Sequence, residues 1–587
     1  MQVVDCIGID LGTTNSCVAY YKNSEYHVVS ENGRGYIPSV IAVDGYKTIC
    51  GFPAELLKGR KNAAYELKRI LGKRFSDPIA QECKRPDDSI IVHLQDKERS
   101  YDLAVNELYS MLIKSIIEKS EAVIGDTVKK AVITVPATFS DIYRSITMLC
   151  AEAAGLEVVQ ILEEPVAAAI CYADQIENNS NVLVFDMGGG TFDVCILEIT
   201  ADEHGQRLYK KLATDGDPFL GGMDITKKLA ESVRKRLQDA GRDIPNESKL
   251  LSMCEKVKIE ISMHDSADLG NYNDDYEGIL VTRDELERYI SDITNKAIQI
   301  VNRCVERAGL AAVNIDSVIM VGGSSNLEYF KGKLNQIFRR VERTLNVEEA
   351  IAKGALMYYM GVNGMLNNTQ IVLRMETNAR YVIQQPNDQV YVMIDNKRPY
   401  GIEIQKKFTT FRDGDSFIQL PLAQGNSNLF SENQYIGRLI IRNIPIKPKG
   451  EVVVTVHCKV DMNGIVHFSA KMDPIDGFPE RDAVAELSNP VLPTDREEVV
   501  QTINYYGKKR EEVEKQKQKV RCQQQLMKMK SCLSDRRYEG NMWYYYSLVQ
   551  NWCDYADVTS KEYETVINGI LDQLGTEGFM RHEVEVA

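Results

Sequence analysis

The sequence predicts a mixed α/β unit, then an all-β segment, then a helical end. Three observations predict this order. Short β-rich runs alternate with helical patterns up to about residue 362, strands alternate with turns from about 380 to 487, and the chain turns polar and helical after Pro493. A chain of 587 residues is also too long for a single hydrophobic core, so several packed units are expected.

In the α/β part, strands are expected at residues 131–135, 182–185 and 317–321, and helices at 106–124 and 283–308. Turn-forming residues at 363–370 and the short apolar run "IVLRM" then indicate a linker.

The all-β segment is clearest in "EVVVTVHCKVDMNGIVHFSAKM", where Asn463 and Gly464 separate two alternating runs as a hairpin turn does. Near the end, Thr494 is expected to cap a helix that opens with acidic residues. A helical stripe predicts the core of a small bundle more strongly than a partner surface, and it consists of Tyr545, Leu548, Trp552 and Tyr555.

Composition excludes several classes of protein. The net charge of −14 argues against a nucleic-acid binder. No apolar run approaches the ~18 residues of a membrane span, and "MQVVDCIGID" does not resemble a secretory signal. Thirteen cysteines without paired spacing indicate buried thiols, with neither a disulfide framework nor a zinc site. A soluble cytoplasmic protein is therefore expected.

Two stretches interrupt apolar runs with glycines beside a carboxylate: "IGIDLGTTNSCVAYY", containing Asp10, and "VLVFDMGGGTFDVCILEI", containing Asp186. Glycine inside a strand costs backbone entropy, so its repetition requires a reason. In a strand–turn–strand hairpin, glycines let backbone N–H groups point at phosphate oxygens, and the Asp can hold a hydrated Mg²⁺. One copy alone could be an ordinary tight turn, but two facing copies would hold the phosphates of a nucleotide from both sides.

A third glycine turn occurs in "VIMVGGSSNLEYFKGKL", where Gly322 and Gly323 join an apolar strand to a helix. Such a turn lets a flat or anionic ligand approach the backbone near a helix N-terminus. Alone it is explained equally well as a routine strand-to-helix turn. Together with the paired hairpins it indicates an adenosine site.

Seven motifs follow one another in the first 360 residues: "IGIDLGTTNSCVA", "ITVPATFSD", "ILEEPVAAAICYA", "VLVFDMGGGTFDV", "FLGGMDI", "CEKVKIEIS" and "VIMVGGSS". In sequence and order they resemble the signatures of the seventy-kilodalton heat-shock chaperones of the DnaK type. The all-β segment resembles the peptide-binding domain of that family more loosely, through "KKFTTFRDGDSFIQLPLAQG". The C-terminal helices match only in position and character.

The resemblance implies an actin-like, two-lobed α/β ATPase domain over residues 1–366 and a linker over 367–379. A β-sandwich peptide-binding domain over 380–490 and a helical lid over 491–587 would follow. It further implies a chaperone, with a stress-response role, that couples ATP hydrolysis to binding and release of unfolded clients. ATP or ADP, Mg²⁺ and K⁺ are the implied cofactors, and a dedicated J-domain co-chaperone and a nucleotide exchange factor are the implied partners.

Two alternatives remain open. A small-molecule kinase of the same superfamily would share the hairpins, but it would not need an all-β domain after residue 376. A non-hydrolysing holdase or exchange-factor relative would keep the fold and lose turnover. The presence of Lys68, Thr191 and Asp193 argues against that second alternative.

The resemblance also assigns site residues. Lys68 falls at the catalytic lysine, where an ammonium can orient the attacking water and offset charge on the γ-phosphoryl oxygens. The other catalytic positions are Glu164, Asp186, Thr191 and Asp193. Mg²⁺ would be held largely through water by Asp10, Asp186, Asp193 and Glu164. Taken singly, Lys68 could instead be a solvated helix lysine and Asp186 a turn residue.

The nucleotide-binding positions form two groups. The phosphate loops comprise Gly12, Thr13, Thr14, Asn15, Gly188, Gly189 and Gly190. The adenosine side comprises Gly221, Gly222, Glu255, Lys258, Ser262, Gly322, Gly323, Ser324, Asn326 and Glu348. In the peptide-binding domain, Phe411 falls at an arch over the peptide and Ile418 at its apolar pocket, although Ile418 could equally be an ordinary strand residue.

The chain departs from the family at several positions. Asn326 replaces an arginine that stacks on adenine, which predicts weaker nucleotide binding. The linker carries Arg374 and Met375 and lacks the usual acid. On the face where J-domains dock, the family's Arg, Asn and Thr are replaced by Gln160, Glu163 and Val166. An acidic J-domain motif would lose its cationic partner there and meet a carboxylate.

Overall fold

The computed structural model describes residues 5–71, 91–97, 99–202, 206–343, 346–366, 370–479, 481–482, 484–486, 499–505, 508–509 and 512. One compact unit takes in residues 1–43 and 48–500, and a second takes in residues 44–47 and those from 501 onward. Residues 499–505 are helical. The cap at Thr494, the aromatic stripe and most of the expected lid lie outside the described residues.

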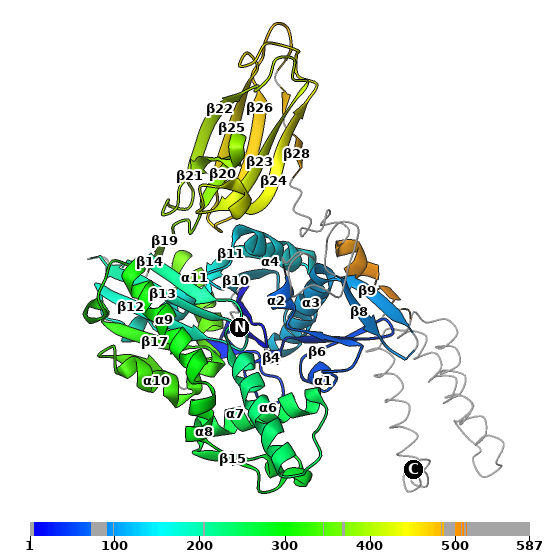
Figure 1. Cartoon of the computed structure of the whole chain (residues 1–587), viewed down its shortest axis with the longest axis vertical. Helices are drawn as coiled ribbons and strands as arrows, with labels where there is room; N and C mark the ends of the chain where they lie inside the picture. The colour runs from blue at the N-terminus through cyan, green and yellow to red at the C-terminus, as the bar shows by residue number, and fades with distance from the viewer. Residues whose placement is uncertain are drawn as a thin grey trace, which may run out of the picture. The chain divides into compact units, whose positions relative to one another are not determined.

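Two sheets built on one plan form the α/β part (Figure 1). The first has the order β11-β10-β1-β2-β3, with β4 (Ile37–Pro38) also on β2, and its strands are β1 (Cys6–Leu11), β2 (Asn15–Lys22), β3 (Glu25–Val28), β10 (Lys130–Val135) and β11 (Glu157–Glu163). The second has the order β18-β17-β12-β13-β14-β19, and its strands are β12 (Ser180–Met187), β13 (Phe192–Ala201), β14 (Arg207–Asp217), β17 (Ser317–Val321), β18 (Val341–Arg343) and β19 (Ile371–Arg374).

The two sheets share their pairing pattern as well as their order. In each, three consecutive strands form an antiparallel meander, and two later strands add in parallel beside its first strand. The repeated glycine motif therefore belongs to a larger structural repeat, in which each copy comprises one of the two sheets.

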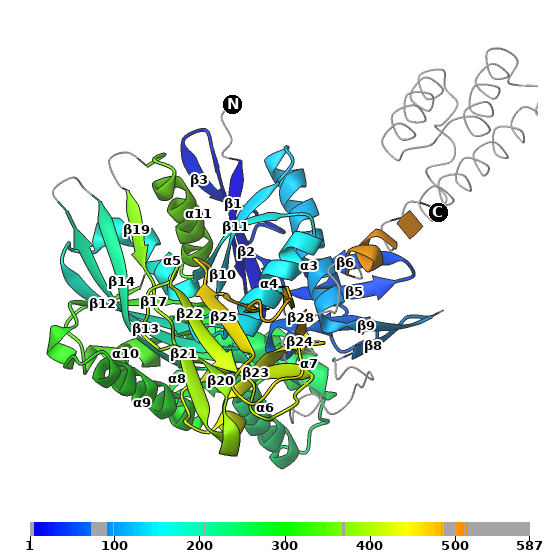
Figure 2. The same ribbon diagram turned by 90° about the horizontal axis from the view of Figure 1, so that it is seen from above.

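Two helices, α5 (Glu164–Cys171) and α11 (Ala350–Val362), lie between these sheets and contact strands of both (Figure 2). Glycines allow the close packing. A Cβ added at Gly354 would overlap the carbonyl oxygen of Ala167, and one at Gly8 would overlap that of Ala352. The apolar core between the sheets includes Leu162 and Val184 from facing strands. This packing fixes the distance between the two halves.

The other helices of this part are α1 (Phe52–Glu55), α2 (Leu67–Ile70), α3 (Val105–Ile124), α4 (Asp141–Ala153), α6 (Gly222–Asp239), α7 (Glu247–Met263), α8 (Arg283–Tyr289), α9 (Ser291–Arg307) and α10 (Glu328–Asn335). Its small sheets use β5 (Val40–Asp44), β6 (Lys47–Cys50), β7 (Ala63–Tyr65), β8 (Ile91–Gln95), β9 (Ser100–Ala104), β15 (Ser266–Asp268) and β16 (Leu280–Thr282). The helix predicted at 106–124 is confirmed. The one predicted at 283–308 is two helices, because Ile290 (φ −99°, ψ 11°) leaves helical geometry.

Between β19 and residue 486, the only regular elements of the described residues are strands and short 3₁₀ turns, as predicted. A five-stranded sheet has the order β21-β20-β23-β24-β28, with β20 (Arg380–Gln384), β21 (Val390–Ile394), β23 (Phe417–Gly425), β24 (Gln434–Arg442) and β28 (Val484–Glu486). A four-stranded sheet has the order β22-β25-β26-β27, with β22 (Glu403–Thr409), β25 (Val453–Val460), β26 (Val466–Met472) and β27 (Arg481–Asp482). The two sheets touch through β24 with β26 and β21 with β22. The hairpin turn at Asn463 and Gly464 is confirmed, with Gly464 at φ +75°.

The described cysteines bear out the expected thiols. Nine of them are free, and all but Cys171 are buried. Burial raises their pKa values, for example that of Cys254 to about 12, so these thiols stay protonated. Among the helices that the structure describes, none is both long and apolar enough to cross a membrane.

Candidate functional site

The two glycine hairpins meet face to face. A Cβ added at Gly189 would overlap Oγ1 of Thr14, and one at Gly190 would lie 2.7 Å from Cγ2 of Thr13. Only glycine therefore fits where the loops converge. Within the described residues, the buried Oγ1 of Thr14 has no hydrogen-bond partner. A buried hydroxyl without a partner is unfavourable unless a ligand satisfies it, which supports a phosphate site here.

Lys68, from the short helix α2, lies among the predicted acids. Its Nζ is 2.8 Å from Oε1 of Glu164, and both side chains are less than a tenth exposed. Nζ also lies 5.6 Å from the ring centre of Phe139. Burial alone would lower the pKa of Lys68, but the charges of Glu164 and Asp10 outweigh it and raise the pKa. Lys68 is therefore a buried ammonium and not a solvated helix lysine.

Three further carboxyls surround this pair. Asp186 and Asp193 are cross-strand partners at the ends of β12 and β13, and Asp10 lies on β1. Burial, followed by the charge of Glu164, raises the pKa of Asp10 and of Asp193 to about 7 and that of Asp186 well above its ordinary value. Four carboxyls thus share one ammonium, an arrangement that a cation would relieve.

This donor set fits Mg²⁺, which prefers oxygen ligands and keeps several of its waters. In the part of the chain that the structure describes, no three His, Cys, Asp or Glu side chains are placed to ligate a metal directly. Water-mediated binding is the mode that these carboxyls allow. Asp186 is only 5% exposed and pairs with Asp193 across the two strands, so it is a buried member of the acidic cluster and not a solvent-exposed turn residue.

On the predicted adenosine side, Lys258 of α7 joins that helix to the start of α6. Its Nζ donates to Oε2 of Glu255 (2.7 Å), to the carbonyl of Gly222 (3.0 Å) and to Oγ1 of Thr226 (3.1 Å). Gly221 lies beside the second glycine loop, since a Cβ there would lie 2.7 Å from N of Gly190. Glu255 and Lys258 are three residues apart on α7 and therefore lie on the same face of that helix.

The third glycine turn reaches the same place. Gly322 has φ +81°, and a Cβ there would lie 2.5 Å from Oδ1 of Asp186. Oγ of Ser324 donates to the carbonyl of Gly188 (2.9 Å). A Cβ at Gly323 would lie 2.9 Å from Oε1 of Glu348. All three glycine turns predicted from the sequence therefore converge.

The peripheral positions are less tightly tied to this centre. Ser262 donates to the carbonyl of Ile259 within its own helix (2.6 Å). The carbonyl of Asn326 accepts from Arg343 (3.1 Å). Ser262 lies in the last turn of α7, and Asn326 ends the 3₁₀ turn after β17.

Two residues of this centre were missed in the sequence. Thr138 donates to Oδ1 of Asp193 from its Oγ1 (2.8 Å) and its backbone N (3.3 Å). Arg69 donates to the carbonyl of Gly190 (2.7 Å) and to Oδ2 of Asp224 (3.0 Å), so it joins α2 to the second loop and to α6. Their positions in the sequence could have indicated both residues, because Arg69 directly follows Lys68 and Thr138 lies inside the motif "ITVPATFSD".

The expectation that Glu163 presents a carboxylate on a docking face is wrong. Glu163 is 1% exposed, and its Oε1 accepts from Arg144 (2.7 Å) and from Lys211 (2.7 Å). Val166 is fully buried as well. Of the three substituted positions only Gln160 is partly exposed, and its Nε2 donates to the carbonyl of Met462 (2.8 Å).

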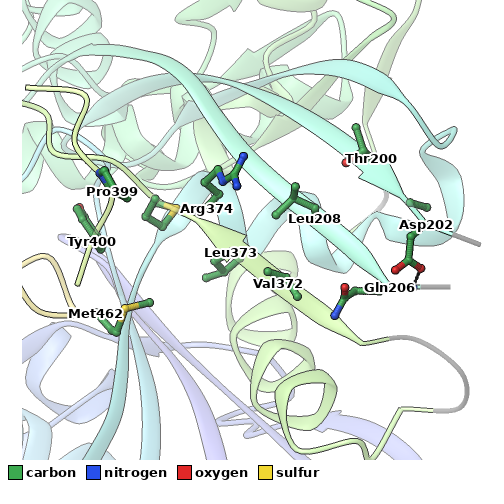
Figure 3. Close-up of a pocket in the computed structure, with 12 residues that line it drawn as sticks. Thr200, Asp202, Gln206, Leu208, Val372, Leu373, Arg374, Pro399, Tyr400 and Met462 are labelled. Carbon is green, nitrogen blue, oxygen red and sulfur yellow. Dashed lines mark hydrogen bonds between the residues drawn. The ribbon is translucent and has the colours of Figure 1, made fainter. Parts of the chain in front are cut away.

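The expected linker is partly a strand. Residues 371–374 form β19, which pairs in parallel with β14. Beside it lies a pocket of about 480 Å³ (Figure 3). Thr200, Leu208 and Val372 are register partners across three strands of its wall, while Tyr400 and Met462 enter from the all-β segment. Arg374 is exposed and Met375 is buried, so the linker packs against both parts of the chain.

The two predicted peptide-binding residues lie in different surroundings. Phe411 is 46% exposed in the loop between β22 and β23. Ile418 is 6% exposed on β23, where it pairs with Ile441. Phe411 is thus available to a ligand, whereas Ile418 contributes to the interior.

A model of a protein family matches this chain. The sequence model described as Hsp70 protein matches residues 6–543, nearly the whole chain. The matched range includes all three glycine turns, the acidic cluster around Lys68 and both sheets of the all-β segment.

Proposed function

The chain belongs to the Hsp70 family, and we propose that it is an ATP-dependent chaperone in which ATP binding and hydrolysis drive binding and release of unfolded polypeptide segments. Membership supports a chaperone function in general, and members of the family are ATPases. The observation that carries the proposal is the buried ion pair of Lys68 and Glu164, among three further carboxyls, where the two glycine loops converge.

Each part of this centre has a role in phosphoryl transfer. Backbone N–H groups of Gly12, Gly189 and Gly190 bind phosphate oxygens, with the hydroxyls of Thr13 and Thr14 as further donors. The N–H of Gly188 instead closes the hairpin, because it donates to the carbonyl of Thr191 (3.0 Å). Lys68 and Thr191 act on the γ-phosphoryl group, where a fixed positive charge stabilises the transition state. Mg²⁺, when bound, supplies charge neutralisation at the phosphates. Glu164 keeps Lys68 charged and in place.

The remaining assignments follow the same division. Glu255, Lys258, Ser262, Asn326 and Glu348 would enclose the adenosine. Clients would bind in the all-β part, a β-sandwich over residues 380–490, with Phe411 over the peptide. A linker over 367–379 would carry the coupling, a lid over 491–587 would cover the client, and K⁺ could accompany Mg²⁺. Co-chaperones with a J-domain and nucleotide exchange factors are the partners to expect.

A small-molecule kinase is a weaker candidate. It would share the glycine hairpins, but it has no use for the two antiparallel sheets after β19. Those sheets also contact the α/β part: Tyr381 and the N–H of Val466 donate to Asp141, and Ile161 donates to Asn463. Such contacts favour a protein in which the two parts communicate.

Single-turnover hydrolysis of ATP tests the proposal. Lys68→Met and Thr191→Ala should each slow hydrolysis by about 100-fold or more and change ATP affinity only a few-fold, because the lost groups act on the transition state. Unfolded peptides should accelerate the wild type. Lys210→Met, at a partly exposed ion pair with Glu198, is the matched control. Equal rates in all four proteins would show that the centre is wrongly assigned.

A further inference from the structure

Three buried charged side chains meet beside the all-β segment, where Nη1 of Arg144 donates to the carbonyl of Asn463 (3.5 Å). Glu163 ends β11, Arg144 lies on α4, and Lys211 lies on β14. Both cations donate to the same oxygen, Oε1 of Glu163, at 2.7 Å, and all three side chains are at most 5% exposed. Glu163 and Arg144 belong to the half with the first sheet, and Lys211 belongs to the second sheet.

Neutralising a buried carboxylate does not require two cations. Arg144 and Glu163 alone would form a neutral buried pair, and Lys211 adds a second cation to the same carboxylate. Burial would lower the pKa of Lys211, but the charge of Glu163 outweighs it and raises the pKa, so Lys211 stays charged. Buried charges are weak evidence for stability by themselves. The bond from Lys211 therefore needs a reason other than stability.

Position in the chain supplies that reason. Glu163 is the last residue of β11, and Glu164 is the first residue of α5, followed by Pro165. The two neighbouring carboxylates bind different partners: that of Glu163 goes to Lys211 and Arg144, and that of Glu164 goes to Lys68. Fixing Glu163 thus fixes the strand-to-helix turn that presents Glu164.

The second sheet carries other parts of the centre. Lys211 pairs in register with Leu197 of β13, the strand on which Asp193 lies, and Gly216 of β14 pairs with Asp193 itself. A change in the angle between the sheets would move β14 and β13 together, and Lys211 would transmit that change to the turn at Glu163. The bond is therefore placed to keep Glu164 and Lys68 at a fixed position relative to Asp193.

We propose that Lys211 and Glu163 form a positioning bridge between the two sheets, which holds Glu164 against Lys68 for hydrolysis. The bridge rests on the proposed ATPase function. Neither residue touches the reacting atoms, and both act through Glu164.

Lys211→Met tests the bridge with little risk to the fold, because Arg144 and Glu163 remain as a neutral pair. We expect kcat for ATP to fall about 10- to 100-fold, since a misplacement of about 1 Å at a reacting centre has an effect of that size. KM should stay within about threefold, because the phosphate and adenosine contacts are untouched. Lys211→Arg should restore kcat to within about threefold, since it keeps the charge and the donors.

Lys210→Met is the matched control. Lys210 is adjacent on β14, and its partly exposed pair with Glu198 lies within one sheet, so kcat should be unchanged. If Lys211→Met does not fold, Glu163→Asp provides the test. This variant keeps all three charges, but its shorter side chain moves the acceptor oxygen away from Lys211. It should show the same loss of kcat at constant KM.

The outcomes separate two failures. A wild type without ATPase activity would overturn the proposed function, and the bridge with it. An active wild type beside Lys211→Met or Glu163→Asp with unchanged kcat would overturn the bridge alone. An equal loss in Lys210→Met, or no rescue by Lys211→Arg, would also overturn it, by showing a general effect of disturbing β14.

Discussion

Replacing Asp141 by Asn should make the contact between α4 and the all-β segment independent of pH. Asp141 is 5% exposed; its Oδ1 accepts from the hydroxyl of Tyr381 (2.7 Å) and its Oδ2 from N of Val466 (2.9 Å). Burial raises the pKa of Asp141 to about 7, against the lowering effects of these bonds and of Arg144. The nearby Asp461 raises it further, and His467, paired with Asp461, faces the same contact.

The sign and the size of the effect follow from this pKa. A carboxyl whose pKa is raised by the contact holds its proton more tightly there than in water. The contact is therefore strongest below pH ~4, weakens as pH rises toward about 7, and levels off above that value. With an ordinary value of ~3.9 in the separated state, the contact weakens by about 1.4 kcal/mol, or roughly tenfold, between pH 6 and pH 8.

Hydrogen exchange at Val466 measures this directly, because its N–H donates to Asp141. After correction for intrinsic exchange, protection of this amide should fall about tenfold from pH 6 to pH 8 in the wild type and stay constant in Asp141→Asn. Comparing the two proteins separates Asp141 from His467, which is present in both. Asp126→Asn, an exposed site, should behave as the wild type. An equal fall in Asp141→Asn, or no fall in the wild type, would refute the reasoning.

Three further predictions concern binding. Asn326→Arg should tighten ATP and ADP binding by about 0.5 to 2 kcal/mol, because a guanidinium can stack on adenine, and calorimetric titration with unchanged or weaker binding would contradict this. A generic J-domain should stimulate the wild-type ATPase poorly and Gln160→Arg better, because Gln160 lacks the charge that an acidic motif needs; strong stimulation of the wild type would contradict it. Phe411→Ala should weaken binding of a labelled apolar peptide in fluorescence anisotropy without changing thermal unfolding, whereas Ile418→Ala should cost about 2 to 4 kcal/mol of stability; the reverse pattern would exchange their roles.

The sequence predicted those parts of the fold that depend on local signals. Apolar runs marked the strands at 131–135 and 317–321, and glycines beside Asp10 and Asp186 marked the two hairpins. The convergence of the glycine turns could also be expected, because two copies of a phosphate-binding hairpin are useful only when they face one another. These features follow from neighbours in the chain.

Features that depend on distant partners could not be predicted. The environment of Glu163 is set by cations 19 and 48 residues away, and no local pattern reveals that a carboxylate at this position is buried. Burial of Lys68 likewise depends on Glu164, from a different part of the chain. The break at Ile290 was missed because apolar periodicity continues from α8 into α9 across the change in backbone.

The contact of Asp141 and the bond from Lys211 to Glu163 respond differently to pH. Asp141 is held by two neutral donors and has a pKa of about 7, so its charge changes near neutrality. Glu163 is held by two cations whose own pKa values are raised against burial, chiefly by Tyr400 and Glu163 for Arg144 and by Glu163 for Lys211. Those cations keep their charge well above neutral pH, so the bond from Lys211 persists where the contact of Asp141 weakens. A rise in pH should therefore loosen the all-β segment from α4 while the two large sheets stay joined, and the two contacts can be measured independently.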